Sequence, residues 1–313
     1  MRKKARNSAP LVAATLSALL AASAAAQKAL PRTPDGHPDL QGIWANDTVT
    51  MLERPRRFAN KAVFTEAEAV AYERDPAGRW SDRFGELEVT TTGELSDEWQ
   101  EHGTVVPGRR TSLILDPETG RIPALTPLAR ARADARADAL TAHPADGPED
   151  RTIQERCLLG PSGPPMIPPP YNQNLQIVQT RDRVLIVTEM IHDTRIVRLN
   201  AGHLPAAIRR WSGDSVGTWE GDTLVVDTTN FADQTRWRGS GEGLHVVERF
   251  TRDSAAAIRY DFTVDDPASF SRPWSGRLWI TRATTPMYEY ACHEGNYAMV
   301  GILKGARFSE GQK

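Results

Sequence analysis

The sequence predicts a mainly β protein, an antiparallel barrel or strongly curved sheet preceded by an irregular, partly helical N-terminal arm. From Leu175 onward, β-branched and polar residues alternate in short runs, which is the pattern of half-buried strands. Turn-forming residues separate several of these runs, and no helical pattern lies between them. Because parallel neighbours need long crossover connections, strands that follow one another so closely are expected to pair antiparallel.

The runs with a strand pattern are residues 175–180, 183–192, 194–199, 223–231, 244–252, 257–264, 276–283 and 287–292. Turn signals lie at Arg181 and Asp182, at residues 219–222 and at residues 251–255. Many short antiparallel strands with such spacing are typical of barrels and sandwiches.

Two of the predicted strands mix polar and apolar residues on one face. Glu248 shares a face with Val246 and Phe250, and Glu294 shares a face with Tyr290. A sheet with one face in water usually keeps the two kinds of residue apart. The mixed faces therefore favour the lining of a cavity within the sheet.

Residues 1–26 have the pattern of a secretory signal peptide. Basic residues come first, Pro10 to Ala22 forms a short apolar stretch, and Ala24-Ala25-Ala26 matches the small-residue cleavage pattern. The apolar stretch is too short for a spanning helix, and no later stretch is long enough. We therefore expect a periplasmic or extracellular protein with no membrane span after cleavage. An uncleaved N-terminal anchor is the alternative.

The expected arm covers residues 27–170 and the expected β domain covers residues 171–313. In the arm, Thr65 and Glu68 have the capping-box spacing, which predicts a helix that ends before Pro76. Residues 160–174, rich in proline, are expected to form an extended strap across the domain, because proline donates no backbone hydrogen bond.

A second helix is predicted to begin after Thr126, with Pro127 in its first position. Its residues are rich in alanine and charge and leave almost no apolar stripe. The helix should therefore lie on the surface. A strand is expected between the two helices, at Thr111 to Leu115, before a turn at residues 116–120.

Charge and cysteine content limit the partners and the compartment. The chain has 313 residues and a net charge of −2, and removal of the basic signal segment makes this charge more negative. Nucleic-acid partners usually require a basic surface, so none is expected. In an oxidising compartment the two cysteines, Cys157 and Cys292, are expected to form a disulfide. Two free buried thiols are the alternative.

Several motifs together resemble an uncharacterised family of exported bacterial β-rich proteins. They are DGHPDLQGIW (35–44), RTSLILDPETGRIP (110–123), EMIHDTRIVRL (189–199), WEGDTLVVDTTNF (219–231) and YEYACHEGNY (288–297). The resemblance implies that residues 27–313 form one compact unit, and it carries over no activity and no catalytic residue. The Gly42-Ile43-Trp44 start is also similar to that of lipocalin-like barrels, which is an analogy of fold alone.

Stretches that place histidine near carboxylate or arginine predict an acid–base site. The candidate catalytic residues are His192, Arg195, His245, Glu248, His293 and Glu294. Histidine titrates near neutral pH, and a carboxylate can fix its tautomer. We expect His293 or His192 to act as the base, Glu248 or Glu294 to orient it or donate a proton, and Arg195 to stabilise negative charge. For each histidine, a partly buried ring bonded to a backbone carbonyl is the alternative.

A zinc site made of His192, His245 and His293 is a rival hypothesis. No two of these histidines have a metal-binding spacing on one element, and no glycine-rich nucleotide motif occurs, so no cofactor or metal is expected. The sequence therefore predicts a secreted enzyme that carries out acid–base hydrolysis or elimination on a small polar or aromatic molecule. A non-catalytic periplasmic binding protein and a zinc-dependent hydrolase are the alternatives.

Overall fold

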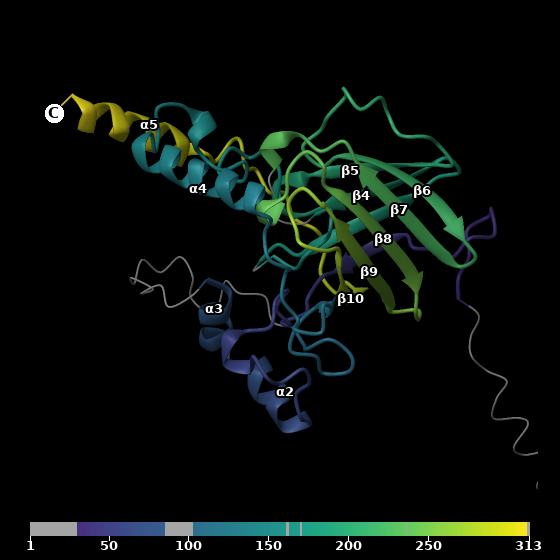
Figure 1. Ribbon diagram of the computed structural model, residues 1–313. Helices are drawn as coiled ribbons and strands as arrows, with labels where there is room; N and C mark the ends of the chain where they lie inside the picture. The colour runs from purple at the N-terminus through teal and green to yellow at the C-terminus, as the bar shows by residue number, and fades with distance from the viewer. Residues whose placement is uncertain (1–29, 85–102, 161–162, 170, 236, 312–313) are drawn as a thin grey trace, which may run out of the picture.

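The strands form a closed barrel. The computed structural model describes residues 30–84, 103–160, 163–169, 171–235 and 237–311 (Figure 1). The sheet runs in the order β1-β3-β4-β5-β6-β7-β8-β9-β10, β1 pairs again with β10 to close the barrel, and β2 is added outside on β10. The predicted barrel is therefore confirmed. The predicted signal peptide, residues 1–26, lies outside the described residues.

The strands are β1 (Gly42–Ala45), β2 (Ile114–Asp116), β3 (Asn174–Gln179), β4 (Arg183–Thr188), β5 (Thr194–Leu199), β6 (Asp214–Glu220), β7 (Thr223–Thr229), β8 (His245–Arg252), β9 (Ala257–Asp265) and β10 (Trp274–Arg282). All pairs are antiparallel except β5 with β6, which are parallel and are joined by the long connection 200–213. Burial alternates strictly along β7, β8 and most of β9, so one side of each strand faces the core.

The structure differs from the expected strands in several places. The strand expected over residues 183–192 ends at Thr188, and Met190–His192 form a 3₁₀ turn. Residues 287–292 form no strand; they run in coil and turn toward the helix α5 (Tyr297–Glu310). β1 and β6 were not expected, because β1 is short and the alternation of β6 is interrupted by Gly217. Gly217 packs so closely that an added Cβ atom would lie 2.8 Å from a methyl group of Val197, so glycine permits the parallel contact with β5.

Trp44 on β1 is enclosed in the core between two arginines. Its indole is fully buried, and Nε1 donates to the carbonyl of Leu40 at 2.8 Å. The guanidinium groups of Arg252 and Arg282 lie 4.7 and 4.3 Å from the ring centroid, within cation–π range. Gly42 lets Arg282 reach the ring, because an added Cβ atom would lie 1.8 Å from an Arg282 nitrogen.

The proline-rich strap packs into the core of the barrel. Residues 164–169 are all buried, and Met166 and Ile167 belong to the main hydrophobic core together with barrel residues such as Phe262. The strap thus fills space inside the barrel, which is more than the expected crossing over the domain. Met166 is 1% exposed in this core.

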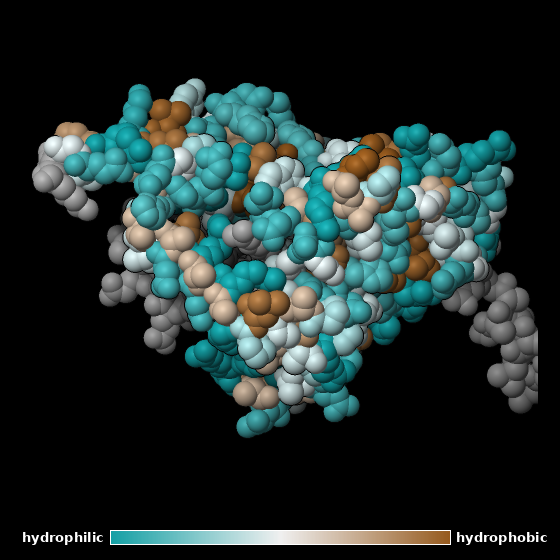
Figure 2. Space-filling view, turned by 45° about the horizontal axis from the view of Figure 1, so that its top comes forward, coloured by the Kyte–Doolittle hydropathy of each residue, from teal (hydrophilic) through white to brown (hydrophobic). Residues whose placement is uncertain are grey.

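The helices α2 and α4 start where the sequence predicts, whereas α3 was not expected. α2 (Glu66–Glu73) has the full capping box of Thr65 and Glu68, and α3 (Pro76–Phe84) begins at the proline that ends it. α4 (Pro127–Ala142) is capped by Thr126 and buries only Ala129. α4 and α5 extend from the barrel in the same direction, and Figure 2 shows apolar side chains on this projecting part among hydrophilic ones. None of the helices in the described ranges has the length and apolar character of a membrane span.

Candidate functional site

Arg195 and Glu248 meet inside the barrel. They come from β5 and β8, and their side chains are 8% and 0% exposed. Arg195 Nη2 donates to Glu248 Oε1 at 2.9 Å, and Nη1 makes a second bond to Oε2. The structure therefore brings these two predicted site residues together, but as a bidentate ion pair that leaves neither charge free.

Tyr260 on β9 extends this pair to the strap. Its hydroxyl donates to Glu248 Oε1 at 2.7 Å and accepts from the backbone amide of Met166 at 2.8 Å. Burial and the neighbouring Glu248 charge raise the pKa of Tyr260 well above its ordinary value, so the hydroxyl stays protonated. The network inside the barrel is thus saturated, which is what a low-dielectric interior demands of polar groups.

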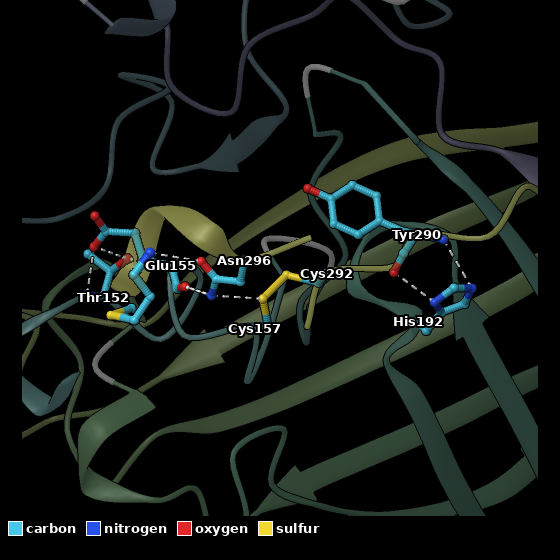
Figure 3. Close-up of a disulfide and its surroundings, with 8 residues drawn as sticks. Thr152, Glu155, Cys157, His192, Tyr290, Cys292 and Asn296 are labelled. Atoms are coloured by element: carbon cyan, nitrogen blue, oxygen red, sulfur yellow. Dashed lines mark hydrogen bonds between the residues drawn. A yellow bond between two sulfur atoms is a disulfide. The ribbon is translucent and has the colours of Figure 1, made fainter. Parts of the chain in front are cut away.

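His192 and Glu189 hold the segment that leads to α5. His192 Nδ1 lies 3.0 Å from the carbonyl oxygen of Tyr290, and Nε2 accepts from the Tyr290 amide at 3.3 Å (Figure 3). The buried Glu189 accepts from the Tyr288 amide at 2.9 Å. His192 therefore matches the alternative of a ring satisfied by backbone, with its proton on Nδ1.

His293 and Glu294 lie in an exposed turn after the disulfide. Cys157 and Cys292 are bonded with a Cα–Cα separation of 5.8 Å, which confirms the predicted bridge. The alternation that placed His293 and Glu294 in a cavity was derived from a strand that does not exist, so that placement is wrong. In the described part of the chain, neither side chain has a hydrogen-bond or ion-pair partner.

His245 faces the outside of the barrel and meets a carboxylate that the sequence reasoning did not select. His245 Nε2 lies 3.0 Å from Oδ2 of Asp227 on β7. The two side chains are 38% and 40% exposed. Glu248, three residues along β8, points inward, so His245 and Glu248 lie on opposite faces and do not form a dyad.

A second histidine completes a chain of alternating groups on this outer face. His203, in the connection 200–213, has Nε2 at 2.9 Å from Asp227 Oδ1 and Nδ1 at 3.1 Å from Asp214 Oδ2. Asp214 also accepts from Arg198 and from the Leu204 amide, both at 2.9 Å. The order is therefore Arg198, Asp214, His203, Asp227 and His245, which we call the outer histidine–aspartate array.

The contacts within the array raise the pKa of its histidine His245 and lower the pKa of its aspartates Asp227 and Asp214. The hydrogen bond to Asp227 raises the pKa of His245 against partial desolvation, and the charge of Asp265 adds to this effect. The bond from His245 lowers the pKa of Asp227, with partial burial opposing and His203 assisting. Burial opposes ionisation of Asp214, but Leu204, His203 and Arg198 outweigh it and lower its pKa.

His203, Asp214 and Asp227 were missed for different reasons. Alternation along 223–229 does put Asp227 on the outward face beside the strand of His245, so pairing these neighbouring strands could have found it. His203 lies in an irregular connection, where no periodicity fixes its position. Its contacts depend on the parallel pairing of β5 and β6, which the sequence does not indicate.

The three histidines of the rival zinc hypothesis do not gather. His192 binds the Tyr290 backbone, His245 binds Asp227 and His293 lies in the exposed turn. Across the residues that the structure describes, no group of three or more His, Cys, Asp or Glu side chains has a metal-binding arrangement. The proposed set of His192, His245 and His293 is therefore wrong as a ligand set.

Comparisons with known proteins give no family for this chain. No family model, no curated protein and no solved structure matches it. Any function must therefore be argued from the geometry of the site.

Proposed function

We propose that the chain is an acid–base catalyst that hydrolyses, or eliminates a group from, a small polar molecule at His245. The observation that carries the proposal is the orientation of this ring. Nε2 is engaged by Asp227, whereas Nδ1 has no partner within the described ranges, and the side chain is 38% exposed.

This orientation fixes the tautomer of the neutral ring. Because Asp227 accepts through Oδ2, the Nε2 atom carries the proton and Nδ1 presents its lone pair. An imidazole whose second nitrogen is held by a carboxylate is a stronger and better-aligned base. Nδ1 of His245 can therefore take a proton from a water molecule or from a substrate, and return it to a leaving group.

Asp227 and His203 support the charge that forms on His245 during the reaction. Asp227 stabilises the imidazolium, and His203 holds the other oxygen of the same carboxylate at 2.9 Å. Both nitrogens of His203 face carboxylate oxygens, so the two bonds form together only when the ring carries two protons. Asp214, 1% exposed, keeps His203 in that position.

Location outside the cytoplasm is part of the proposal. The Cys157–Cys292 disulfide supports it, because such bonds persist in oxidising compartments. The binding-protein alternative makes a different forecast for the same site: a ligand would bind at the array without being converted.

Hydrolysis of p-nitrophenyl acetate, an activated ester, tests the proposal. General base catalysis contributes about 10²–10⁴-fold, so His245→Gln should lose a rate factor of about 100 or more. His143→Gln is the matched control, because His143 also pairs with an aspartate, Asp146 at 2.7 Å, but is 63% exposed at the end of α4. Equal rates for the wild type and His245→Gln would overturn the proposal.

A further inference from the structure

Two arginine side chains and the backbone of a third arginine contact the segment Thr111 to Ile114, which belongs to a motif that the proposed function does not use. Arg54 Nε donates to Thr111 Oγ1 at 3.1 Å, and Arg110 Nη2 donates to the Ile114 carbonyl at 3.2 Å. The backbone amide of Arg277 on β10 donates to the Leu113 carbonyl at 3.0 Å. Contacts to three residues of this segment thus bring three arginines close together, and the charges of Arg54 and Arg277 both act on Arg110.

Arg54 brings a buried charge that no carboxylate balances. The residue is 5% exposed, and its remaining bonds go to the carbonyl oxygens of Glu118 at 2.9 Å and Ala59 at 3.4 Å. In the described ranges it makes no ion pair. Backbone carbonyls satisfy its hydrogen bonds, but they leave its full charge in place.

Arg277 shares its carboxylate with another arginine. Asp261 is bonded to Nε of Arg277 and also to Nε of Arg259, the latter at 3.1 Å. One negative charge therefore faces two positive ones. The charges that act on Arg110 are those of Arg54, Arg277 and Glu118, so two positive charges oppose one negative charge there.

The guanidinium group of Arg110 has a buried donor that lacks an acceptor. Its Nε atom is buried and has no hydrogen-bond partner, and the side chain forms no ion pair with a described residue. An unsatisfied buried donor on a charged group is costly, and native proteins rarely keep one without a reason. Burial lowers the pKa of Arg110, and the charges of Arg54 and Arg277 lower it further, although Glu118 opposes this.

We propose that Arg110, with Arg54 and Arg277, forms a binding site for a phosphate-type oxyanion. The planar guanidinium presents parallel N–H groups that match two oxygens of such an anion, which would satisfy Nε of Arg110. The anion would also offset the repulsion among the three arginines. This site lies at β2 and β10 and does not depend on the array at β7 and β8.

Titration with inorganic phosphate by calorimetry, at constant ionic strength set with chloride, tests this site. The wild type should bind with a Kd of about 1 mM or tighter, and Arg110→Gln should weaken binding about tenfold or more. Arg183→Gln should bind like the wild type, because Arg183 is 53% exposed and pairs with Asp182 in the β3–β4 hairpin. Equal binding by Arg110→Gln, or no binding by the wild type, would overturn the proposal.

Thermal unfolding separates this role from a structural one. In chloride alone, Arg110→Gln should be at least as stable as the wild type, because it removes repulsion and loses one bond to the Ile114 carbonyl. Phosphate should raise the melting temperature of the wild type but not of the variant. Arg110→Lys, which keeps the charge but not the planar fork, should show a smaller phosphate effect than the wild type. A variant that is destabilised equally with and without phosphate would show that Arg110 only supports the fold.

Discussion

Arg195 on β5 and Glu248 on β8 form a two-point ion pair inside a barrel whose other lining is mostly apolar. Burial of such a pair costs desolvation that the mutual attraction only partly offsets, so the pair is a weak source of stability. Its loss is nevertheless expensive, because one partner would remain charged and unpaired.

Glu248→Gln should therefore lower the free energy of unfolding by about 3–5 kcal/mol. Urea unfolding followed by fluorescence gives this value. The matched control is Glu220→Gln, which breaks the exposed pair with Arg249 and should cost about 0–1 kcal/mol. A double replacement, Arg195→Met with Glu248→Leu, should recover much of the loss. If Glu248→Gln is as mild as the control, the pair does not behave as a buried one.

Tyr260→Phe should loosen the strap. The change removes the hydroxyl that joins Glu248 to the Met166 amide, so both groups lose a partner in the core. We expect a loss of about 1–3 kcal/mol and faster hydrogen exchange at the Met166 amide. Tyr288→Phe, at a side chain that is 64% exposed, is the control. Unchanged exchange at Met166 would mean that Tyr260 does not hold the strap.

The dyad of His245 and Asp227 should make stability depend on pH. Because the pKa of His245 is raised, the pairing stabilises the fold fully below about pH 6.5, the ordinary pKa of histidine. This stabilisation is lost as the pH rises through the raised pKa. Because the pKa of Asp227 is lowered, its part of the stabilisation is present above about pH 3.9, the ordinary pKa of aspartate. It is lost as the pH falls through the lowered pKa. The contribution is thus largest between these values.

Asp227→Asn should lower stability more at pH 5.5 than at pH 9, as measured by urea unfolding at both values. Nuclear magnetic resonance should show a lower pKa for His245 in this variant than in the wild type, because the first cause of its shift is removed. An unchanged His245 titration would contradict the pairing.

Replacement of both cysteines by serine should release the C-terminal segment while the barrel stays folded. The bridge closes a loop of 135 residues, and the helix α5 buries none of its side chains. The stabilisation lost should be about 2–5 kcal/mol. Limited proteolysis should then cut between Thr285 and Glu310. Equal resistance in the two proteins would show that Glu189 and His192 hold the segment without the bridge.

The strands of the barrel could be predicted from the sequence better than the segment that follows the last strand. Strands such as β7, β8 and β9 are recognisable because alternation follows the burial of one face. Residues 287–292 show the same alternation, yet they form no strand because no neighbouring strand pairs with them. Periodicity records the preference of a segment, whereas the tertiary partner decides the outcome.

Some features of the candidate site could be predicted from the sequence and others could not. The disulfide and the inward direction of Glu248 followed from compartment and alternation, and both are found in the structure. The partner of His245 did not follow, since Asp227 is separated from it by the β7–β8 connection. His203 required knowledge of an irregular segment, for which sequence patterns carry little information.

A double-mutant cycle on p-nitrophenyl acetate hydrolysis tests the central claim most directly, since it asks whether His245 and Asp227 act as one unit. If they do, His245→Gln combined with Asp227→Asn should lose no more rate than His245→Gln alone, because the aspartate works only through the ring. Rate losses that multiply in the double variant, or an Asp227→Asn enzyme that keeps the wild-type rate, would contradict the account.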